Sequence, residues 1–365
     1  MKQNRWLLAL ALCLLALVGL FTMHLGPHVL GDTQTYIDAM NVLSGHAAPA
    51  GFIPNRIITT FGALEAVRAL SVPLGGILNG WFVLNCGLFI LAGIVFFKLL
   101  EDFFGSRPAA FLGTLFLAGN YGFLVFGLNY LMDIGGWSFY IFSLYFLWRY
   151  ARSKSQCDLF LAAAMVGIGG LLKEYAFLAG VATAAYLIAE AWPGLRSWPG
   201  WKRFLGRSSC AAAVALVPAI VLYVWAYHHF GYTYADWFGS NAAHYIYSSR
   251  IKEYVKALGS LVNVLGLLFI GGAYILYREW RAGIMEKEAR TFLAACFVSF
   301  LPVFIWPAIT QRILTIAIPF IAIVACFLFR KYERRWYAFV PILALYLLAT
   351  FFMDSYLLTA VNLPF

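Results

Sequence analysis

Long runs of hydrophobic residues separated by short polar segments dominate the chain. Several are long enough to cross roughly 30 Å of hydrocarbon as helices. They cover residues 6–25, 77–97, 109–128, 209–230, 258–277, 291–309, 313–329 and 337–357. Residues 135–148 form a shorter aromatic run. The run at 159–189 exceeds one crossing but is too short for two full crossings and a loop, so it predicts two short helices in a tight hairpin around Lys173 and Glu174.

These runs predict an all-α polytopic membrane protein with about eleven transmembrane helices. The composition agrees, because 63% of the residues are hydrophobic, only 12% are charged, and the mean hydropathy is +0.80. A soluble domain needs roughly a quarter of its residues charged, so soluble, secreted and disordered classes are excluded. The net charge of +10 does not indicate a nucleic-acid partner, because the basic residues lie between the apolar runs and form no single patch.

The distribution of basic residues predicts the orientation. With a cytoplasmic N-terminus, every cytoplasmic segment holds at least two Lys or Arg residues, and most of the 26 fall there. The positive-inside rule therefore predicts a cytoplasmic N-terminus and an extracytoplasmic C-terminus. The first apolar run is longer than the core of a signal peptide, so we expect a retained helix. The basic residues left on the outer side, which topology does not require, are Arg56, Arg68, Lys173, Arg250, Lys252, Lys256 and Arg312.

The first outer segment, residues 26–76, begins with an amphipathic pattern. In residues 31–45, GDTQTYIDAMNVLSG, Tyr36 and Met40 fall on one helical face, which predicts a helix lying along the membrane surface. Asp32 stands at the start of this helix. One interpretation is an N-cap, which would lower the pKa of Asp32 and keep it ionised; the other is a reactive carboxylate.

A second outer helix is expected to begin near Arg56, in PNRIITT. The helix dipole opposes a cation at this end, so the position of Arg56 is favourable where an anion such as a lipid phosphate is bound there as well. The alternative is an Arg that reaches to the lipid headgroups. Further along the helix, Glu65 and Arg68 are spaced as an ordinary ion pair.

Lys173 and Glu174 lie at the tip of the predicted hairpin, below the outer surface. Charges at that depth are costly and normally face a cavity or a partner, which indicates a functional site. A self-contained structural ion pair is the alternative. Gln311 and Arg312 open a later span on the outer side, where Arg312 serves either as an interfacial anchor or as a second phosphate ligand.

A second outer segment, residues 231–257, belongs to a stretch rich in Tyr, Trp and His. Such a composition is typical of an interfacial aromatic belt and equally of a sugar-binding surface. His228 and His229 lack metal-ligand spacing, and the outer carboxylates form no DxD-like cluster. We therefore expect no cofactor and no required metal ion.

Two stretches resemble the membrane-embedded GT-C glycosyltransferase superfamily. GDTQTYIDAMNVLSG followed by the Arg of PNRIITT resembles the first outer loop of that superfamily, although several relatives carry Asp-Glu where this chain has Gly-Asp. GIGGLLKEYAFLAG resembles a recurring bacterial Gly-Leu-Leu-Lys-Glu stretch between two short helices. The resemblance covers roughly residues 1–230 and implies a GT-C-like catalytic module there, with a variable C-terminal transmembrane part at 231–365.

The resemblance implies an inverting glycosyltransferase in a bacterial inner membrane. It would transfer a sugar from a polyprenyl-phosphate donor to a glycan, lipid or protein acceptor on the extracytoplasmic face. Asp32 would be the catalytic base. The implied substrate-binding residues are Tyr36, Arg56, Lys173, Glu174, Gln311 and Arg312. Two alternatives stay open, namely a transporter or flippase with Lys173 and Glu174 as its site, and a lipid-linked glycan ligase or polymerase.

Overall fold

The computed structural model describes residues 2–194, 197–245, 250–305 and 310–360, and these residues are helical throughout the bundle, with no strand among them. The N-terminal helices are α1 (Lys2–His24), α2 (Gly31–Leu43), α3 (Asn55–Leu74), α4 (Ile77–Phe104), α5 (Arg107–Ala118), the π-helix η1 (Gly122–Phe126) and α6 (Asp133–Ser153). The middle of the chain forms α7 (Gln156–Leu172), η2 (Glu174–Ala176), α8 (Phe177–Ala191), η3 (Trp192–Gly194), α9 (Trp198–Phe230) and α10 (Tyr234–Tyr245). The C-terminal helices are α11 (Arg250–Arg281), α12 (Lys287–Phe300), η4 (Leu301–Ile305), α13 (Gln311–Leu314), η5 (Thr315–Ala317), α14 (Ile318–Lys331), η6 (Glu333–Phe339) and α15 (Val340–Ala360).

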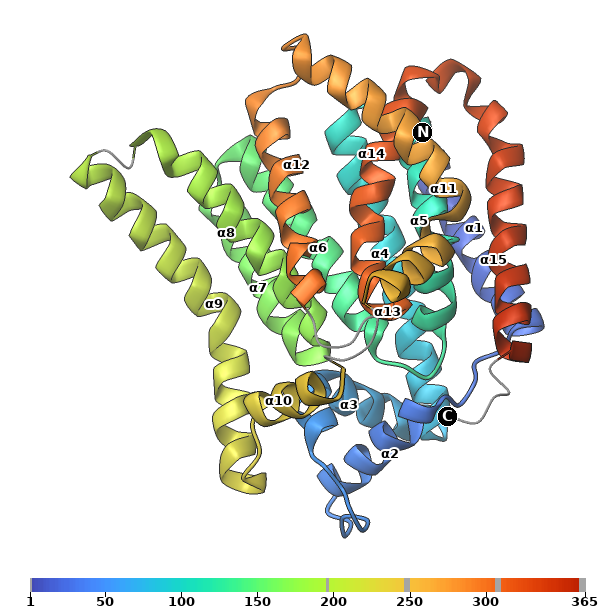
Figure 1. The fold of residues 1–365 in the computed structure, drawn as a ribbon, viewed down its shortest axis with the longest axis vertical. Helices are drawn as coiled ribbons and strands as arrows, with labels where there is room; N and C mark the ends of the chain where they lie inside the picture. The colour runs from blue at the N-terminus through green and yellow to red at the C-terminus, as the bar shows by residue number, and fades with distance from the viewer. Residues whose placement is uncertain (1, 195–196, 246–249, 306–309, 361–365) are drawn as a thin grey trace.

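Within the described residues, each predicted apolar run lies mainly on one or more of these helices, which confirms the all-α membrane architecture. Among the described residues, 8 helices are long and apolar enough to cross a membrane, and α5 and α7 are shorter apolar helices. The count of about eleven crossings and their orientation stay predictions. One assignment differs from the pattern, because α3, expected as an outer helix, is itself long and apolar enough to span. Figure 1 shows α2 and α3 next to each other at the end of the bundle opposite the N-terminus.

The predicted hairpin is confirmed as a break between α7 and α8. Lys173 has an extended backbone with φ of −166°, and the short helix η2 follows it. Glycines of α6 allow the hairpin tip to approach, because a Cβ added to Gly136 would lie 2.9 Å from the Lys173 Cβ. A larger residue at Gly136 would therefore push the tip away from α6.

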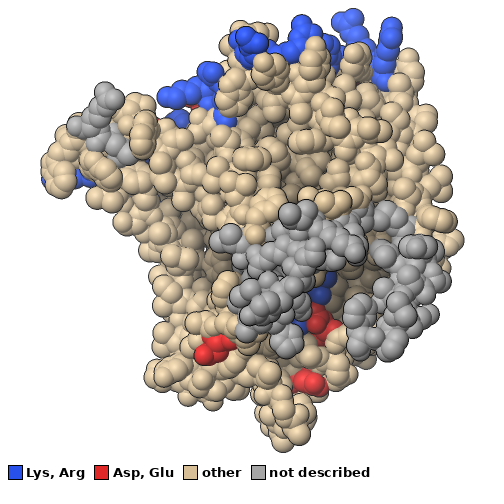
Figure 2. Space-filling model, viewed as in Figure 1, with Lys and Arg blue, Asp and Glu red and all other residues tan. Residues whose placement is uncertain are grey.

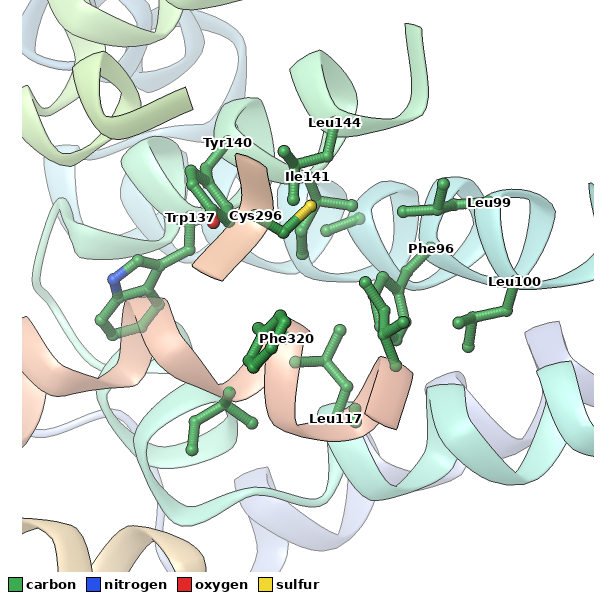
Figure 3. Packing of buried hydrophobic residues seen from close by; sticks show 14 of the residues in the cluster. Phe96, Leu99, Leu100, Leu117, Trp137, Tyr140, Ile141, Leu144, Cys296 and Phe320 are labelled. Carbon is green, nitrogen blue, oxygen red and sulfur yellow. The ribbon is translucent and has the colours of Figure 1, made fainter. Parts of the chain in front are cut away.

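Helices α4, α5, α6, α12 and α14 enclose the hydrophobic centre of the bundle. Figure 3 shows part of this packing, with side chains from all of these helices interlocked. The residues labelled there are Phe96, Leu99, Leu100, Leu117, Trp137, Tyr140, Ile141, Leu144, Cys296 and Phe320. This packing gives a rigid frame whose outer end carries the polar residues described below.

Basic side chains gather at one end of the bundle. On the face shown in Figure 2, Lys and Arg line the end at which the chain begins, while acidic groups, with a few basic ones beside them, are visible toward the opposite end. The gathering of basic residues at one end has the form that the positive-inside pattern predicts for a membrane protein.

Candidate functional site

Asp32 lies in the first turn of α2 and does not cap it. Leu30 occupies the N-cap position, and its backbone N–H donates to Thr33 Oγ1 at 2.9 Å. The N-cap interpretation of Asp32 is wrong because the helix begins at Gly31, two residues earlier than an N-cap at Asp32 requires. The carboxylate is free to bind elsewhere, and it accepts hydrogen bonds from Arg56 Nη2 and Arg312 Nη1, each at 2.7 Å.

Arg56 of α3 is held in place by side chains of the preceding helix, α2. It lies in the first turn of α3, as predicted, and the anion beside it in this structure is the Asp32 carboxylate. Its guanidinium lies over the Tyr36 ring, 4.8 Å from the centroid, and its Nε donates to Thr35 Oγ1 at 3.2 Å. Tyr36 is fully buried, and its ring packs edge-on against Trp81. The predicted site residue Tyr36 therefore fixes the position of the Arg56 guanidinium.

Arg312 joins Asp32 to a second carboxylate. It lies in α13, whose first residue is Gln311, and its Nε and Nη2 donate to Asp133 Oδ2 at 2.9 and 2.8 Å. Asp133 begins α6 and is completely buried, and its Oδ1 has no hydrogen-bond partner among the described residues. Sequence reasoning did not select Asp133. The available signal was an acidic residue immediately before a short aromatic span.

Lys173 and Glu174 are paired and buried beside these residues. The Lys173 Nζ lies 3.3 Å from Glu174 Oε2, and only 2% of Lys173 and 7% of Glu174 are exposed. The ammonium also lies 5.4 Å from the centroid of the Tyr175 ring, which stacks on Trp137. The structure thus places the predicted hairpin charges in the protein interior, where unpaired charges would be strongly unfavourable.

We call Asp32, Arg56, Asp133, Lys173, Glu174 and Arg312 the ionic cluster. It contains three cations and three carboxylates, drawn from α2, α3, α6, the α7–α8 hairpin and α13. Burial raises the pKa of Asp32, but the positive charges of Arg56, Arg312 and Lys173 together hold it below its ordinary value. The Asp32 carboxylate is therefore ionised and a weak base while both arginines are bound to it.

An apolar cavity of about 710 Å³ reaches this cluster at Glu174. Helices α7, α8 and α9 supply most of its walls, which are mainly hydrocarbon and aromatic side chains. Its lining also includes Glu174, Tyr175 and Ile313, the residue after Arg312. We call it the first cavity. Its volume and apolar lining fit a hydrocarbon chain whose polar end lies near Glu174 of the ionic cluster.

The remaining outer residues are less closely connected with the cluster. Tyr234 of α10 stacks on Tyr223 of α9, and both line the first cavity. Tyr247 and the side chains of Arg250, Lys252 and Lys256 lie outside the described residues. In the described part of the chain no three His, Cys, Asp or Glu residues gather as a metal site. The predicted independence of a metal ion stays a prediction.

Comparisons with known proteins identify the fold. The family model of the dolichyl-phosphate-mannose-protein mannosyltransferases matches residues 69–225. The structure is similar to that of ArnT from Cupriavidus metallidurans in the apo state, with a TM-score of 0.63, 15% identity and 89% of this chain covered. ArnT bound to undecaprenyl phosphate gives a TM-score of 0.62 at 15% identity, with 88% of this chain covered.

The chain spans about 60% of the length of the first ArnT chain and 59% of the second. A comparison with curated proteins gave no significant match. The fold is that of the GT-C glycosyltransferase superfamily, which confirms the resemblance seen in the two sequence stretches.

Proposed function

We propose that this chain, which has the GT-C fold, transfers a sugar from a polyprenyl-phosphate donor to an acceptor hydroxyl. The observation that carries the proposal is the first cavity, an apolar space lined in part by Glu174, which pairs with Lys173, and by Ile313, which follows Arg312. A polyprenyl-phosphate sugar has the matching chemistry, with a long hydrocarbon chain followed by an anionic phosphate. The similarity to ArnT bound to undecaprenyl phosphate supports the same donor class.

The donor phosphate would bind Arg56, Arg312 and Lys173. Arg56 and Arg312 now bind Asp32, whose side chain is 32% exposed and can be replaced by an incoming anion. The N-terminus of α3 adds the positive end of a helix dipole next to Arg56. Fixed positive charges in a site with little water stabilise the negative charge that develops on a leaving phosphate.

Asp32 would then act as the base. When the phosphate binds the two arginines, Asp32 loses its closest positive partners, so its pKa rises and it becomes a stronger proton acceptor. The acceptor oxygen forms a bond to the anomeric carbon, the bond from that carbon to the phosphate oxygen breaks, and its electron pair leaves with the lipid phosphate. The acceptor proton goes to Asp32. This direct displacement inverts the configuration at the anomeric carbon.

The residues that we assign to this reaction come from both parts of the chain. Arg312 belongs to the C-terminal part at 231–365, yet it binds Asp32 of the N-terminal module. We place the site on the extracytoplasmic face of a bacterial inner membrane, because the basic residues gather at the opposite end of the bundle.

Incubation with a panel of defined polyprenyl-phosphate sugars tests the proposal. We expect purified protein in nanodiscs to release polyprenyl phosphate from at least one donor, by transfer or by slow hydrolysis, and the Asp32→Asn variant to be at least 100-fold slower, since positioned bases contribute about 10²–10⁴ in rate. Absence of release from every donor, or equal rates for both proteins, would contradict it.

A further inference from the structure

A smaller cavity, of about 220 Å³, lies between α8 and α9 where these two helices are joined. We call it the second cavity. Figure 1 shows the junction of α8 and α9 at the end of the bundle at which the chain begins. The charged residues that line the cavity are Glu190 of α8 and Arg203 and Arg207 of α9. None of them belongs to the ionic cluster, and the proposed binding of the donor uses none of them.

The two arginines give the second cavity an excess of positive charge. Arg203 and Arg207 are four residues apart, so they lie one turn apart on the same face of α9. The carboxylate of Glu190 already has partners, because Lys154 Nζ lies 2.7 Å from its Oε1 and the Tyr150 hydroxyl donates to its Oε2 at 2.8 Å. Within the described part of the chain, neither arginine pairs with a carboxylate. An anion in this cavity would therefore be stabilised by both guanidinium groups.

Apolar side chains connect the second cavity with the first. Leu187 of α8 and Phe204 of α9 line both of them. Glu174 directly precedes the start of α8, while Glu190 lies in the last turn of this helix, roughly 24 Å further along its axis. The arginines therefore lie at the opposite end of the apolar space from the ionic cluster.

Tryptophans indicate the depth of the second cavity in a membrane. Trp192 and Trp198 flank the junction of α8 and α9 and are 70% and 67% exposed, and Trp201 is 41% exposed. Lys202 Nζ lies 5.5 Å from the centroid of the Trp198 ring. Exposed tryptophans beside basic residues are typical of the level of the lipid headgroups. The guanidinium groups of the cavity are thus at the depth of the headgroup phosphates.

We propose that the second cavity binds an anionic phospholipid, with its phosphate at Arg203 and Arg207 and one acyl chain along Leu187 and Phe204. Basic pockets between transmembrane helices bind anionic headgroups, and guanidinium groups match phosphate oxygens in charge and geometry. A soluble anion would make no use of the apolar outlet. The positive-inside rule explains why basic residues gather at this end, but it does not require two of them to share a cavity with apolar walls. The inference is independent of the proposed function.

Native mass spectrometry of the purified protein with equal amounts of dioleoyl phosphatidylglycerol and dioleoyl phosphatidylcholine tests the site. We expect wild-type protein to retain one phosphatidylglycerol in preference to phosphatidylcholine. Arg203→Gln/Arg207→Gln should weaken this retention about 25-fold, since each basic side chain near an anionic membrane surface contributes about fivefold. Arg203→Lys/Arg207→Lys keeps both charges and should retain the lipid within about fivefold of wild type.

A matched control removes the same charge elsewhere at this end. Arg278 and Arg281 lie in the last turn of α11, are exposed and do not line the second cavity. Arg278→Gln/Arg281→Gln should therefore retain phosphatidylglycerol as wild type does. Size-exclusion chromatography checks that each variant is folded.

Three results would overturn the inference. Equal retention of the two lipids by wild-type protein would show that the cavity does not select an anionic headgroup. Equal losses in the two glutamine double variants would show a general attraction to the basic end. Displacement of the lipid by millimolar glycerol 3-phosphate would show a site for soluble anions. None of these results bears on the proposed function, because no donor is present.

Discussion

Replacement of Arg312 by Met would leave Asp133 as an uncompensated charge in the interior. Asp133 is 0% exposed, its Oδ2 is bound by Arg312 at 2.8–2.9 Å, and its Oδ1 has no partner in the described part of the chain. Breaking a buried pair in this way costs about 3–5 kcal/mol. The side chain of Asp32, the other partner of Arg312, is 32% exposed and keeps its ion pair with Arg56. Loss of the Arg312–Asp32 pair therefore adds at most about 1 kcal/mol.

The double variant Arg312→Met/Asp133→Leu removes both charges and serves as the control. A hydrophobic replacement of a buried ion pair is often neutral or stabilising, so most of the lost stability should return. Unfolding in mixed micelles with increasing SDS measures the free energy of unfolding of each protein. Donor turnover should be absent from both variants, because each lacks a proposed phosphate ligand.

The combination distinguishes the two roles of Arg312. Stability of the single variant equal to wild type would refute the reasoning on Asp133. A double variant as unstable as the single one would show that the loss comes from packing of the Arg312 side chain. Normal donor turnover by the stable double variant would refute its role as a phosphate ligand.

Three further predictions concern the remaining members of the cluster. Asp32→Asn should stay folded, as judged by size-exclusion chromatography, but lose about 10²–10⁴ in kcat, and near-normal turnover would place the base elsewhere. Lys173→Met/Glu174→Gln should keep its stability, because both charges of the buried pair are removed together, but it should lose donor binding. Lys173→Arg should retain part of the donor binding. Unchanged donor affinity in the double variant would show that the pair is structural. The pKa of Asp32 is lowered in the free protein, so its ion pairs stabilise the fold above the unfolded pKa, and this stabilisation is lost as pH falls through the lower folded pKa. With donor bound, the acid limb of kcat should lie at higher pH than the acid limb of kcat/KM. Coincident limbs would contradict the transfer of Arg56 from Asp32 to phosphate.

Local sequence patterns were sufficient for the parts of the site that depend on local structure. The apolar run at 159–189 is too long for one crossing and too short for two, and this length predicted the break at Lys173, because the bilayer thickness sets the length of a spanning helix. The amphipathic segment around Tyr36 and the position of Arg56 at a helix start followed from helix periodicity. These features come from residues that are close together in the chain.

The rest of the site depends on contacts that no local pattern records. Arg312 and Asp133 are 179 positions apart and meet only because α13 folds against the start of α6. The wrong N-cap assignment for Asp32 has a similar origin, since Thr33 supplies the local hydrogen bond and the carboxylate binds distant arginines. The first cavity was also invisible in the sequence, because its walls come from helices with ordinary membrane composition.

Retention of the lipid product tests the central claim most directly, because it requires neither the sugar nor the acceptor to be known. Native mass spectrometry of the purified protein with added polyprenyl phosphate should show one bound copy in wild type. It should show a large loss in Lys173→Met/Glu174→Gln and in Gly180→Trp, because Gly180 lines the first cavity. It should show no change in Gly87→Trp, because Gly87 belongs to α4 and does not line that cavity. Equal retention by all four proteins would contradict the assignment of the ionic cluster and the first cavity to a polyprenyl-phosphate donor.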